Sequence, residues 1–497
     1  MSDKAKRYYC AIDLGAGSGR AMLGSTDGRT LSLQEVHRFP NPPVTLPDGL
    51  YWDVLRLWQA VQEGMVQSEQ AAGQPLDGVA VDTWGVDYAL LDGAGQLLGN
   101  PRNYRDPRTE GVMEKALERA PQEKIFESTG IHFMRINTLF QLYARVLEGD
   151  AQLAAAKRLL MTPDLLNYWL TGRALGERSI ASTSQCYNPV KGEWADDILQ
   201  ALDIPRALFP ELVSAGTVVG PLREAAARDW GVTACPVIAV GSHDTASAIA
   251  AVPLTGPGEA CLSSGTWSLL GMEIAAPAIS ADSLRYGFTN EVGVGGTIRL
   301  LKNMTGLWLV QEMRRVWQAA GEDVTYDAMA QMAQAAPAFG HFVDTDHPSF
   351  MPPGDMEERI DAYCRQTRQS LAENHAARVR AAFESLVFKY RWALDQLERL
   401  TGQTIHTIHV VGGGTRNTFL NQWTANATGR TVRTGPVEAT AAGNILMQMV
   451  ATGQLESIAA GREMIRASFP TETMQPQDTG IWDEAYPRFC ECVGLKP

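Results

Sequence analysis

The stretch AIDLGAGSGR, residues 11–20, decides how the first part of this 497-residue chain folds. Its glycines, Gly15, Gly17 and Gly19, follow the pattern GxGxG directly after an apolar strand. A dinucleotide fingerprint needs GxGxxG, a helix straight after the glycines and an acid about 20 residues later. Residues 21–39 instead predict two strands joined by a turn. The pattern therefore favours an antiparallel meander and excludes a dinucleotide-binding unit.

Strands that end in a glycine-containing turn recur in both halves of the chain. One further example is a strand that ends at Asp82, followed by a bend at Gly85 and a second strand to Leu91. Another is a hairpin within 259–274. In the last, a strand over 405–411 is followed by three glycines and by a helix that begins near Asn417. A chain of this length exceeds one ordinary core. The repetition predicts two related α/β domains facing each other across a cleft, the N-terminal domain over 1–247 and the C-terminal domain over 248–497.

Helical signals fill the segments between these strands. Residues 162–172, TPDLLNYWLTG, predict a helix with Thr162 as its cap, Pro163 in its first turn and Gly172 at its end. The longest predicted helix covers about 376–400, and its apolar residues recur at helical spacing, so we expect them to face the core. These residues are Leu386, Tyr390, Leu394 and Leu397.

The amino-acid composition limits the kinds of partner that the protein is expected to bind. The chain has 43 basic and 56 acidic residues, a net charge of -13, which argues against a nucleic acid or an anionic membrane surface as the main partner. No stretch reaches about 18 apolar residues, and the charged N-terminal residues lack an apolar run. Seven scattered cysteines without a CxxC pair are typical of buried thiols in a reducing compartment. We expect a cytoplasmic monomer or homodimer that binds neither nucleic acid nor membrane.

The glycine loop over 15–20 has two explanations. A turn between strands needs one glycine for backbone reasons alone. Three alternating glycines beside Ser18 instead suit a loop whose NH groups approach phosphate oxygens. Asp13 is a carboxylate among apolar neighbours, which is costly unless it is paired or binds a cation, and holding the water shell of Mg²⁺ is its most economical role. Arg20 serves either the phosphates or a surface acid.

A second acid stands at a strand end in VIAVGSHDTASAIAAV, residues 237–252. The pattern predicts a strand ending at Gly241 and a helix opened by Asp244. An isolated Asp in this place is most often only a helix cap. Here its neighbours His243 and Thr245 can both hydrogen-bond a polyol, and the segment lies at the presumed domain boundary, where ligands bind. These two neighbours and the position near the domain boundary favour a ligand-binding role for Asp244.

Together these motifs resemble the FGGY family of carbohydrate kinases along nearly the whole chain. The runs that carry the resemblance are, in chain order, VDTWGVDYALLD, YRDPRT, NTLFQLYA, LLMTPDLLNYWLTG, SHDTASA, LSSGTWSLLG, LKNMTGLWLVQE, HVVGGGTRN and TGPVEATAAGN. The glycine loops are shared across the family, whereas VDTWGVD, SHDTASA and LKNMTGLW resemble the branch that acts on L-rhamnulose. The resemblance implies two actin-like ATPase (ribonuclease H-like) domains with a central cleft.

On the sugar side, the resemblance implies ATP-dependent phosphorylation of the C1 hydroxyl of L-rhamnulose to give L-rhamnulose 1-phosphate, in L-rhamnose catabolism. Asp244 is then the catalytic base that takes the hydroxyl proton. The positions implied to contact the sugar are Gly85, His243, Asp244, Thr245 and Asn303.

On the nucleotide side, the resemblance implies ATP as co-substrate together with Mg²⁺. The implied nucleotide contacts are Ala16, Gly17, Ser18, Gly19, Arg20, Thr266, Gln311, Gly413 and Gly414, with the last two near the adenosine end. Asp13 is implied to organise Mg²⁺ through water.

Two other functions share these motifs. Another ketose or polyol kinase of the family, acting on L-fuculose or L-xylulose, would have every phosphate loop in common with the first. A non-kinase actin-like ATPase would need only a group that activates water, and the run SHDTASA, with its histidine beside the acid, favours a bound polyol over a water.

Overall fold

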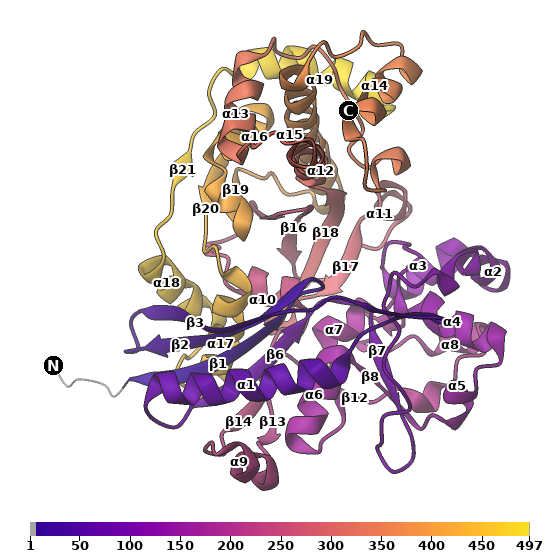
Figure 1. Ribbon diagram of the computed structural model, residues 1–497, viewed down its shortest axis with the longest axis vertical. Coiled ribbons are helices and arrows are strands. Elements are labelled where there is room, and N and C mark those ends of the chain that lie inside the picture. Colours follow the sequence, from indigo (N-terminus) through magenta and orange to yellow (C-terminus); the bar gives the residue numbers. More distant parts are fainter. Residues whose placement is uncertain (1–5, 497) are drawn as a thin grey trace. The chain divides into compact units, whose positions relative to one another are not determined.

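The structure is a computed structural model that describes residues 6–496 (Figure 1). Its contacts divide the chain into two compact units. The first unit comprises the residues up to Pro253 together with Glu273–Leu300 and Glu438–Pro470, and the second comprises Leu254–Met272, Leu301–Val437 and the residues from Thr471 onward. Both units are therefore discontinuous in sequence, whereas the domains expected from the sequence are two continuous halves divided between 247 and 248.

The first unit is built on a six-stranded sheet with the order β13-β14-β6-β1-β2-β3. These strands are β1 (Arg7–Leu14), β2 (Ser18–Thr26), β3 (Leu31–Pro40), β6 (Gly78–Thr83), β13 (Thr217–Pro221) and β14 (Pro236–Ala239). β1, β2 and β3 pair antiparallel, which confirms the predicted meander. β6 runs parallel to β1, and β14 runs parallel to β6. The carboxyl ends of β1, β6 and β14 therefore meet at one edge of the sheet.

Helices cover both faces of this sheet. α1 (Val54–Ala72) lies on the face that carries Ile12, and its Gly64 permits a close approach because a Cβ there would lie 2.7 Å from the Cβ of Ala21. α17 (Ala439–Ala451) packs on β1 and β6 from the other face. β1 is thus buried on both sides, which explains why its sequence reads as a continuous apolar run.

One local prediction is confirmed and one is wrong. The second strand after the bend at Gly85 is present as β7 (Tyr88–Leu91), and it pairs with β8 (Arg158–Met161) in a separate two-stranded sheet. Thr162 does not cap α6 (Thr162–Thr171), because Met161 is the capping position and the Thr162 hydroxyl donates to the backbone oxygen of Asp87. The helix ends at Gly172 as predicted, with φ 85°.

The remaining elements of the first unit surround the sheet and its strand ends. They are β4 (Val44–Leu46), β5 (Gly49–Tyr51), α2 (Val112–Arg119), α3 (Gln122–Thr129), α4 (Thr138–Glu148), α5 (Ala151–Ala155), β9 (Leu175–Glu177), α7 (Arg178–Ser182), β10 (Tyr187–Asn188), β11 (Glu193–Trp194), α8 (Asp196–Ala201), β12 (Glu211–Val213), α9 (Glu224–Trp230), α10 (Asp244–Ala250), α11 (Ala281–Tyr286), β17 (Thr289–Val292) and α18 (Ile458–Ser468).

The second unit repeats the topology of the first. Its neighbouring strands, in order, are β18 (Ile298–Thr305), β16 (Trp267–Ile274), β15 (Glu259–Ser264), β19 (Thr407–Val411), β20 (Thr431–Thr434) and β21 (Thr473–Met474). β15 forms an antiparallel hairpin with β16 and pairs in parallel with β19, as β1 does with β2 and β6. The repetition of strands that end in glycine turns therefore predicted a real structural repeat.

Helices of the second unit flank these strands. They are α12 (Trp308–Ala319), α13 (Tyr326–Ala335), α14 (Met356–Gln366), α15 (His375–Thr401), α16 (Thr418–Thr428) and α19 (Thr479–Val493). α15 is the predicted long helix, and the predicted stripe of four residues on it is buried. Among residues 6–496, no helix has both the length and the apolar character that crossing a membrane requires.

The cysteines are free thiols, and all except Cys492 are buried. Burial raises the pKa of Cys10 and Cys186 to about 12, so these thiols stay protonated and pack as small apolar groups. The prediction that the cysteines are buried is confirmed for six of the seven.

The tightest helix contact of the first unit joins α10 and α17. A Cβ at Gly443 of α17 would lie 1.7 Å from the backbone oxygen of Ser247 on α10. The two helices can pack at this distance only with glycine at this position. The contact fixes α10, which carries Asp244, against the helix that covers the sheet.

We expect Gly443→Ala to lower the free energy of unfolding by about 1–3 kcal/mol because the added methyl group overpacks this contact. Gly480→Ala is the matched control, since Gly480 lies in helix α19 and a Cβ there meets nothing within 4 Å. The control gains helix propensity and should match or exceed the stability of the wild type. Thermal and urea denaturation compare the variants, and equal stability of Gly443→Ala and Gly480→Ala would contradict the packing argument.

Candidate functional site

Two buried carboxylates lie side by side where β1 and β6 end. Asp13 and Asp82 are register partners across this parallel pair. Asp13 accepts two hydrogen bonds from Arg20, at 3.0 Å from Nε and 2.8 Å from Nη2, and Arg20 also pairs with Glu438. Asp82 accepts a 2.6 Å hydrogen bond from the Nδ2 of Asn444 on α17. Arg20 thus pairs with two carboxylates, the buried Asp13 and the part-exposed Glu438.

Both carboxyl groups resist ionisation. Burial raises the pKa of Asp13, although Arg20 opposes the shift. Burial and the neighbouring charge of Asp13 hold the pKa of Asp82 well above its usual range. The Oδ1 of Asp82 is buried and has no hydrogen-bond partner. Two adjacent acidic groups with a free oxygen are the donor chemistry that suits Mg²⁺.

Direct protein ligands for such a cation are few. Within residues 6–496, no group of three or more His, Cys, Asp or Glu side chains is arranged to hold a metal ion. Mg²⁺ commonly keeps several waters of its hydration shell when it binds to proteins.

The glycines of the loop between β1 and β2 do not all have the same explanation. Gly19 is required by packing, because a Cβ there would lie 2.4 Å from the ring of Phe39. A Cβ at Gly17 would meet nothing within 4 Å, so no steric need explains this second glycine. The loop closes through a 3.0 Å hydrogen bond from the NH of Gly15 to the oxygen of Ser18. The exposed Gly17 and Ser18 leave a bare backbone that an anion can approach.

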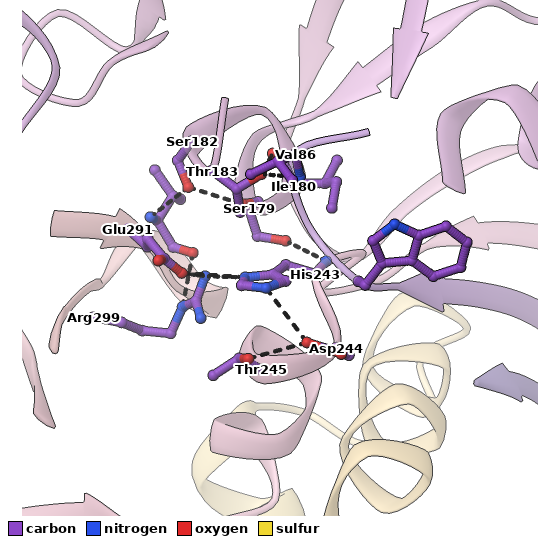
Figure 2. A network of polar contacts seen from close by, with 12 residues as sticks. Val86, Ser179, Ile180, Ser182, Thr183, His243, Asp244, Thr245, Glu291 and Arg299 are labelled. Carbon is purple, nitrogen blue, oxygen red and sulfur yellow. Dashed lines mark hydrogen bonds and ion pairs between the residues drawn. The ribbon is translucent and has the colours of Figure 1, made fainter. Parts of the chain in front are cut away.

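Asp244 is not a helix cap. α10 begins at Asp244 and its capping position is His243, which makes no side-chain cap hydrogen bond. The Asp244 side chain is 32% exposed. Its Oδ1 accepts a 3.0 Å hydrogen bond from the Thr245 hydroxyl and lies 3.4 Å from the Nε2 of His243 (Figure 2). A part-exposed carboxylate held in place on one side is the geometry that a general base requires.

The ring of His243 lies between two carboxylates. Figure 2 shows Asp244 on one side of the ring and Glu291 on the other. The Nδ1 of His243 lies 3.1 Å from the Oε2 of Glu291, which in turn lies 3.0 Å from the Nη2 of Arg299. Burial would raise the pKa of Glu291, but Arg299 and His243 together hold this pKa below its usual range. Glu291 is therefore a buried anion beside the histidine.

The backbone before α10 is held by a buried acid, Glu177. Its Oε2 accepts a 3.2 Å hydrogen bond from the NH of Ser242, and it also accepts from the hydroxyl of Ser179. That hydroxyl accepts a 3.2 Å hydrogen bond from the NH of His243. Burial raises the pKa of Glu177 in spite of these donors. The strand-to-helix turn that presents Asp244 is thereby fixed from behind.

Gly85, an expected sugar contact, lies beside an aromatic cluster. Asp87 accepts hydrogen bonds from the indole NH groups of Trp52 at 2.5 Å and Trp84 at 2.9 Å, and from Gln141 at 3.1 Å. Burial raises the pKa of Asp87 to about 6, and these donors limit the shift. The cluster makes a rigid apolar wall where the chain leaves β6.

The second unit holds a cavity of about 450 Å³, a size suited to a small organic ligand. Gln311, Gly413 and Gly414 of the predicted nucleotide contacts line it. The hydroxyl of Thr266 donates a 2.9 Å hydrogen bond to the Oε1 of Gln311, which joins a fourth predicted residue to the group. The sequence did not single out the other lining side chains. These include Tyr326, Asp327, Phe383, Arg416 and Phe419.

The last predicted sugar contact, Asn303, lies on β18 of the second unit, and its Oδ1 is buried without a hydrogen-bond partner. The other predicted sugar contacts and the residues from Asp13 to Arg20 belong to the first unit. In the first unit, sequence reasoning missed Asp82, Glu291 and Arg299. Of these three residues, only Asp82 could have been identified from the sequence, because it stands at the end of its predicted strand as Asp13 does.

Comparison with protein families matches both parts of the chain. Residues 8–251 match the N-terminal domain of the FGGY family of carbohydrate kinases, and residues 260–452 match the C-terminal domain. The chain belongs to the FGGY family of carbohydrate kinases. As an FGGY kinase it is an enzyme that phosphorylates a carbohydrate, which confirms the family and the enzyme class expected from the sequence.

Curated relatives cover nearly the whole of this FGGY kinase. A rhamnulokinase from Bacteroides thetaiotaomicron is 42% identical over 98% of this chain and 100% of its own. A rhamnulokinase from Enterococcus faecalis is 42% identical over 96% of each chain, and one from Bacillus subtilis is 38% identical over 95% of this chain and 96% of its own.

Solved structures share the fold at lower identity. A gluconate kinase from Lactobacillus acidophilus has a TM-score of 0.83 at 17% identity, over 98% of this chain and 97% of its own. A xylulose kinase from Rhodospirillum rubrum has a TM-score of 0.82 at 18% identity, over 97% of each chain. A Plasmodium falciparum glycerol kinase has a TM-score of 0.80 at 14% identity, over 99% of each chain. The predicted actin-like fold is confirmed.

We expect Asp87 to make stability depend on pH. Its folded-state pKa of about 6 exceeds the ordinary 3.8, so the folded state keeps a proton that the unfolded state has lost, and stability falls as pH rises between these values. Relative to Asp87→Asn, the wild type should lose about 2 kcal/mol of unfolding free energy from pH 4 to pH 7. Denaturation of both proteins across this range measures it. A difference that stays constant would contradict the shifted pKa.

Proposed function

We propose that the chain is an ATP-dependent kinase that phosphorylates the C1 hydroxyl of L-rhamnulose to give L-rhamnulose 1-phosphate, in the breakdown of L-rhamnose. The observation that carries the proposal is the identity of 37–42% to rhamnulokinases over nearly the full length of both chains. The position of Asp244 at the start of α10 supports it, because a part-exposed carboxylate there suits a polyol acceptor.

In the proposed reaction Asp244 acts as the general base. It accepts the proton of the C1 hydroxyl while the oxygen attacks the γ-phosphorus of ATP, whose bond to the bridging oxygen breaks to release ADP. Phosphoryl transfer depends mainly on positioning and charge stabilisation, so an ordinary carboxylate suffices. Thr245, which donates to the Oδ1 of Asp244, fixes the carboxylate plane and leaves Oδ2 for the hydroxyl. His243, Gly85 and Asn303 are the further proposed sugar contacts.

The proposed nucleotide contacts are the loop Ala16, Gly17, Ser18, Gly19 and Arg20 in the first unit, and Thr266, Gln311, Gly413 and Gly414 in the second. When bound, Mg²⁺ would neutralise charge on the phosphates. Asp13 would organise this ion through water, and Asp82, whose free Oδ1 is buried beside it, is suited to share that task. Arg20, which donates two hydrogen bonds to Asp13, would hold its carboxyl group in place. The enzyme is proposed to work in the cytoplasm, as a monomer or homodimer.

The choice of sugar is tested with a panel of ketoses, with ATP and Mg²⁺. We expect kcat/KM for L-rhamnulose to exceed that for L-fuculose and L-xylulose by about 10-fold or more, the scale of discrimination that one or two pocket contacts provide. Coupled detection of ADP measures each rate. Equal or faster turnover of L-fuculose or L-xylulose would replace the proposed substrate.

Asp244→Asn tests the base. The substitution preserves the shape and the Thr245 contact but removes the proton acceptor, so kcat should fall about 10²-fold or more while sugar and ATP binding change little. Asp229→Asn on the exposed end of α9 serves as the control and should behave as the wild type. Activity of Asp244→Asn within a few-fold of the wild type would remove Asp244 from this role.

A further inference from the structure

We propose that side chains of α4 and of the end of α7 hold Val86 in a strained backbone conformation, and that this strained turn positions Gly85 for the sugar. The inference rests on the proposed function, in which Gly85 contacts L-rhamnulose and Asp244 is the base. It makes positioning residues of Thr183 and Thr138, two buried residues that the proposed reaction does not otherwise use.

Val86 has a left-handed backbone conformation, with a φ of 70°. A positive φ is uncommon outside glycine, and for a β-branched residue it is a genuine outlier. Within residues 6–496, Val86 is the only β-branched residue with a positive φ. The NH of Asp87 donates a 3.0 Å hydrogen bond to the oxygen of Gly85, which closes a three-residue turn around Val86. A turn of this kind with a positive φ at its centre is rare and strained.

Three side chains hold both backbone polar groups of Val86. Its NH donates a 3.1 Å hydrogen bond to the hydroxyl of Thr183, as Figure 2 shows. Its carbonyl oxygen accepts hydrogen bonds from the hydroxyl of Thr138 at 2.6 Å and from the Nε2 of Gln141 at 3.3 Å. Both of these donors belong to buried residues of α4. A strained conformation persists only where the surrounding structure enforces it, and these three side chains do so.

The strained turn is also where this part of the chain reaches the surface. In the segment 78–91, only Gly85 and Val86 are part-exposed, and the other residues are buried. A Cβ at Gly85 would lie 3.1 Å from the Cβ of Thr183, so a side chain there would push against the residue that holds Val86. Strained backbone residues cluster at ligand-binding sites, and this one adjoins an expected sugar contact.

α7 connects the strained turn to the segment that presents Asp244. The hydroxyl of Ser179 accepts a 3.2 Å hydrogen bond from the NH of His243, the residue before Asp244. Thr183, which holds the strained turn, lies four residues further on and has helical backbone angles. Residues four apart lie on the same face of a helix, so one short helix fixes both segments. A base must lie within hydrogen-bond distance of the hydroxyl that it deprotonates, so a shift of about 1 Å in the sugar contact would be costly.

Thr183→Val tests this hold on the turn, because valine resembles threonine in shape but cannot accept the hydrogen bond from Val86. We expect kcat/KM for L-rhamnulose to fall about 10- to 100-fold, the scale expected for a misplaced substrate, with KM for ATP within about 3-fold of the wild type. Thr171→Val is the matched control, since the Thr171 hydroxyl also donates to a helix carbonyl oxygen and accepts a backbone NH, that of Arg173. The control should keep its kcat/KM, and an unchanged kcat/KM in Thr183→Val would contradict the inference.

A double variant distinguishes backbone strain from ordinary packing. Glycine adopts a positive φ readily, so after Val86→Gly the turn no longer needs side chains to enforce it. In the Val86→Gly background, Thr183→Val should therefore lower kcat/KM by no more than about 3-fold. An equal loss in both backgrounds would show that Thr183 acts in another way and would overturn the inference. Thr138→Val repeats the comparison at the carbonyl oxygen of residue 86, so the outcome does not depend on the folding of a single variant.

Hydrogen exchange tests the hold on the turn without sugar and without turnover. Mass spectrometry of peptides that cover 78–91 compares the wild type with Thr183→Val. We expect one amide to exchange about 10-fold faster in the variant, because the NH of Val86 has lost its acceptor. Equal exchange would overturn the inference. Failure of the proposed function gives a different result, in which the wild type does not phosphorylate L-rhamnulose although exchange still responds to Thr183→Val.

Discussion

The parallel pairing of β14, β6 and β1 is the constraint on which the site of the first unit depends. Parallel strands end at the same edge of a sheet, and open α/β sheets bind ligands at this edge. The NH of Thr83 at the end of β6 donates a 2.9 Å hydrogen bond to the oxygen of Ser242, and Thr83 is bridged in parallel to His243. This continuation of the sheet past β14 brings the start of α10 beside the ends of β6 and β1. Three acids of distant sequence, Asp13, Asp82 and Asp244, are thereby gathered at one edge.

Gathering these acids costs stability. Asp244 contributes to raising the pKa of both Asp13 and Asp82, and Asp13 contributes to raising the pKa of Asp82, because like charges in a buried setting disfavour ionisation. The fold offsets part of this cost with Arg20 on Asp13 and Asn444 on Asp82. Asn444 is itself held by Gln448, which also donates to the backbone oxygen of Cys10. The polar side chains along α17 therefore hold the buried carboxyl group of Asp82, and buried acids with shifted pKa values are more typical of functional sites than of ordinary cores.

The sequence predicted those features that depend only on residues close together in the chain. The meander after Asp13, the long helix α15, the hairpin of β15 and β16 and the helix opened by Asp244 each follow from residue spacing within one segment. The family could also be predicted from the sequence, because its motifs are spread along the whole chain. Contacts between residues that are far apart in the sequence could not be predicted. Glu291 meets His243 across 48 residues of chain and Asn444 meets Asp82 across 362, and no local pattern marks either pair.

The failed predictions have the same origin. Thr162 has the sequence of a helix cap, yet its hydroxyl is taken by the backbone of Asp87, a partner 75 residues away. The pairing of β7 with β8 also joins segments that are distant in sequence, so the sequence did not predict it. The interleaving of the two units in sequence is likewise a property of tertiary contacts, because 273–300 and 438–470 belong to the first unit although they follow segments of the second.

The central claim is that this FGGY kinase transfers a phosphoryl group to the C1 oxygen of L-rhamnulose. The most direct measurement is the structure of the product formed from L-rhamnulose, ATP and Mg²⁺, determined by ³¹P and ¹H NMR. The account predicts one sugar phosphate whose phosphorus couples to the two protons of the C1 methylene group. Phosphate on another sugar oxygen, or ADP formed without any sugar phosphate, would contradict it.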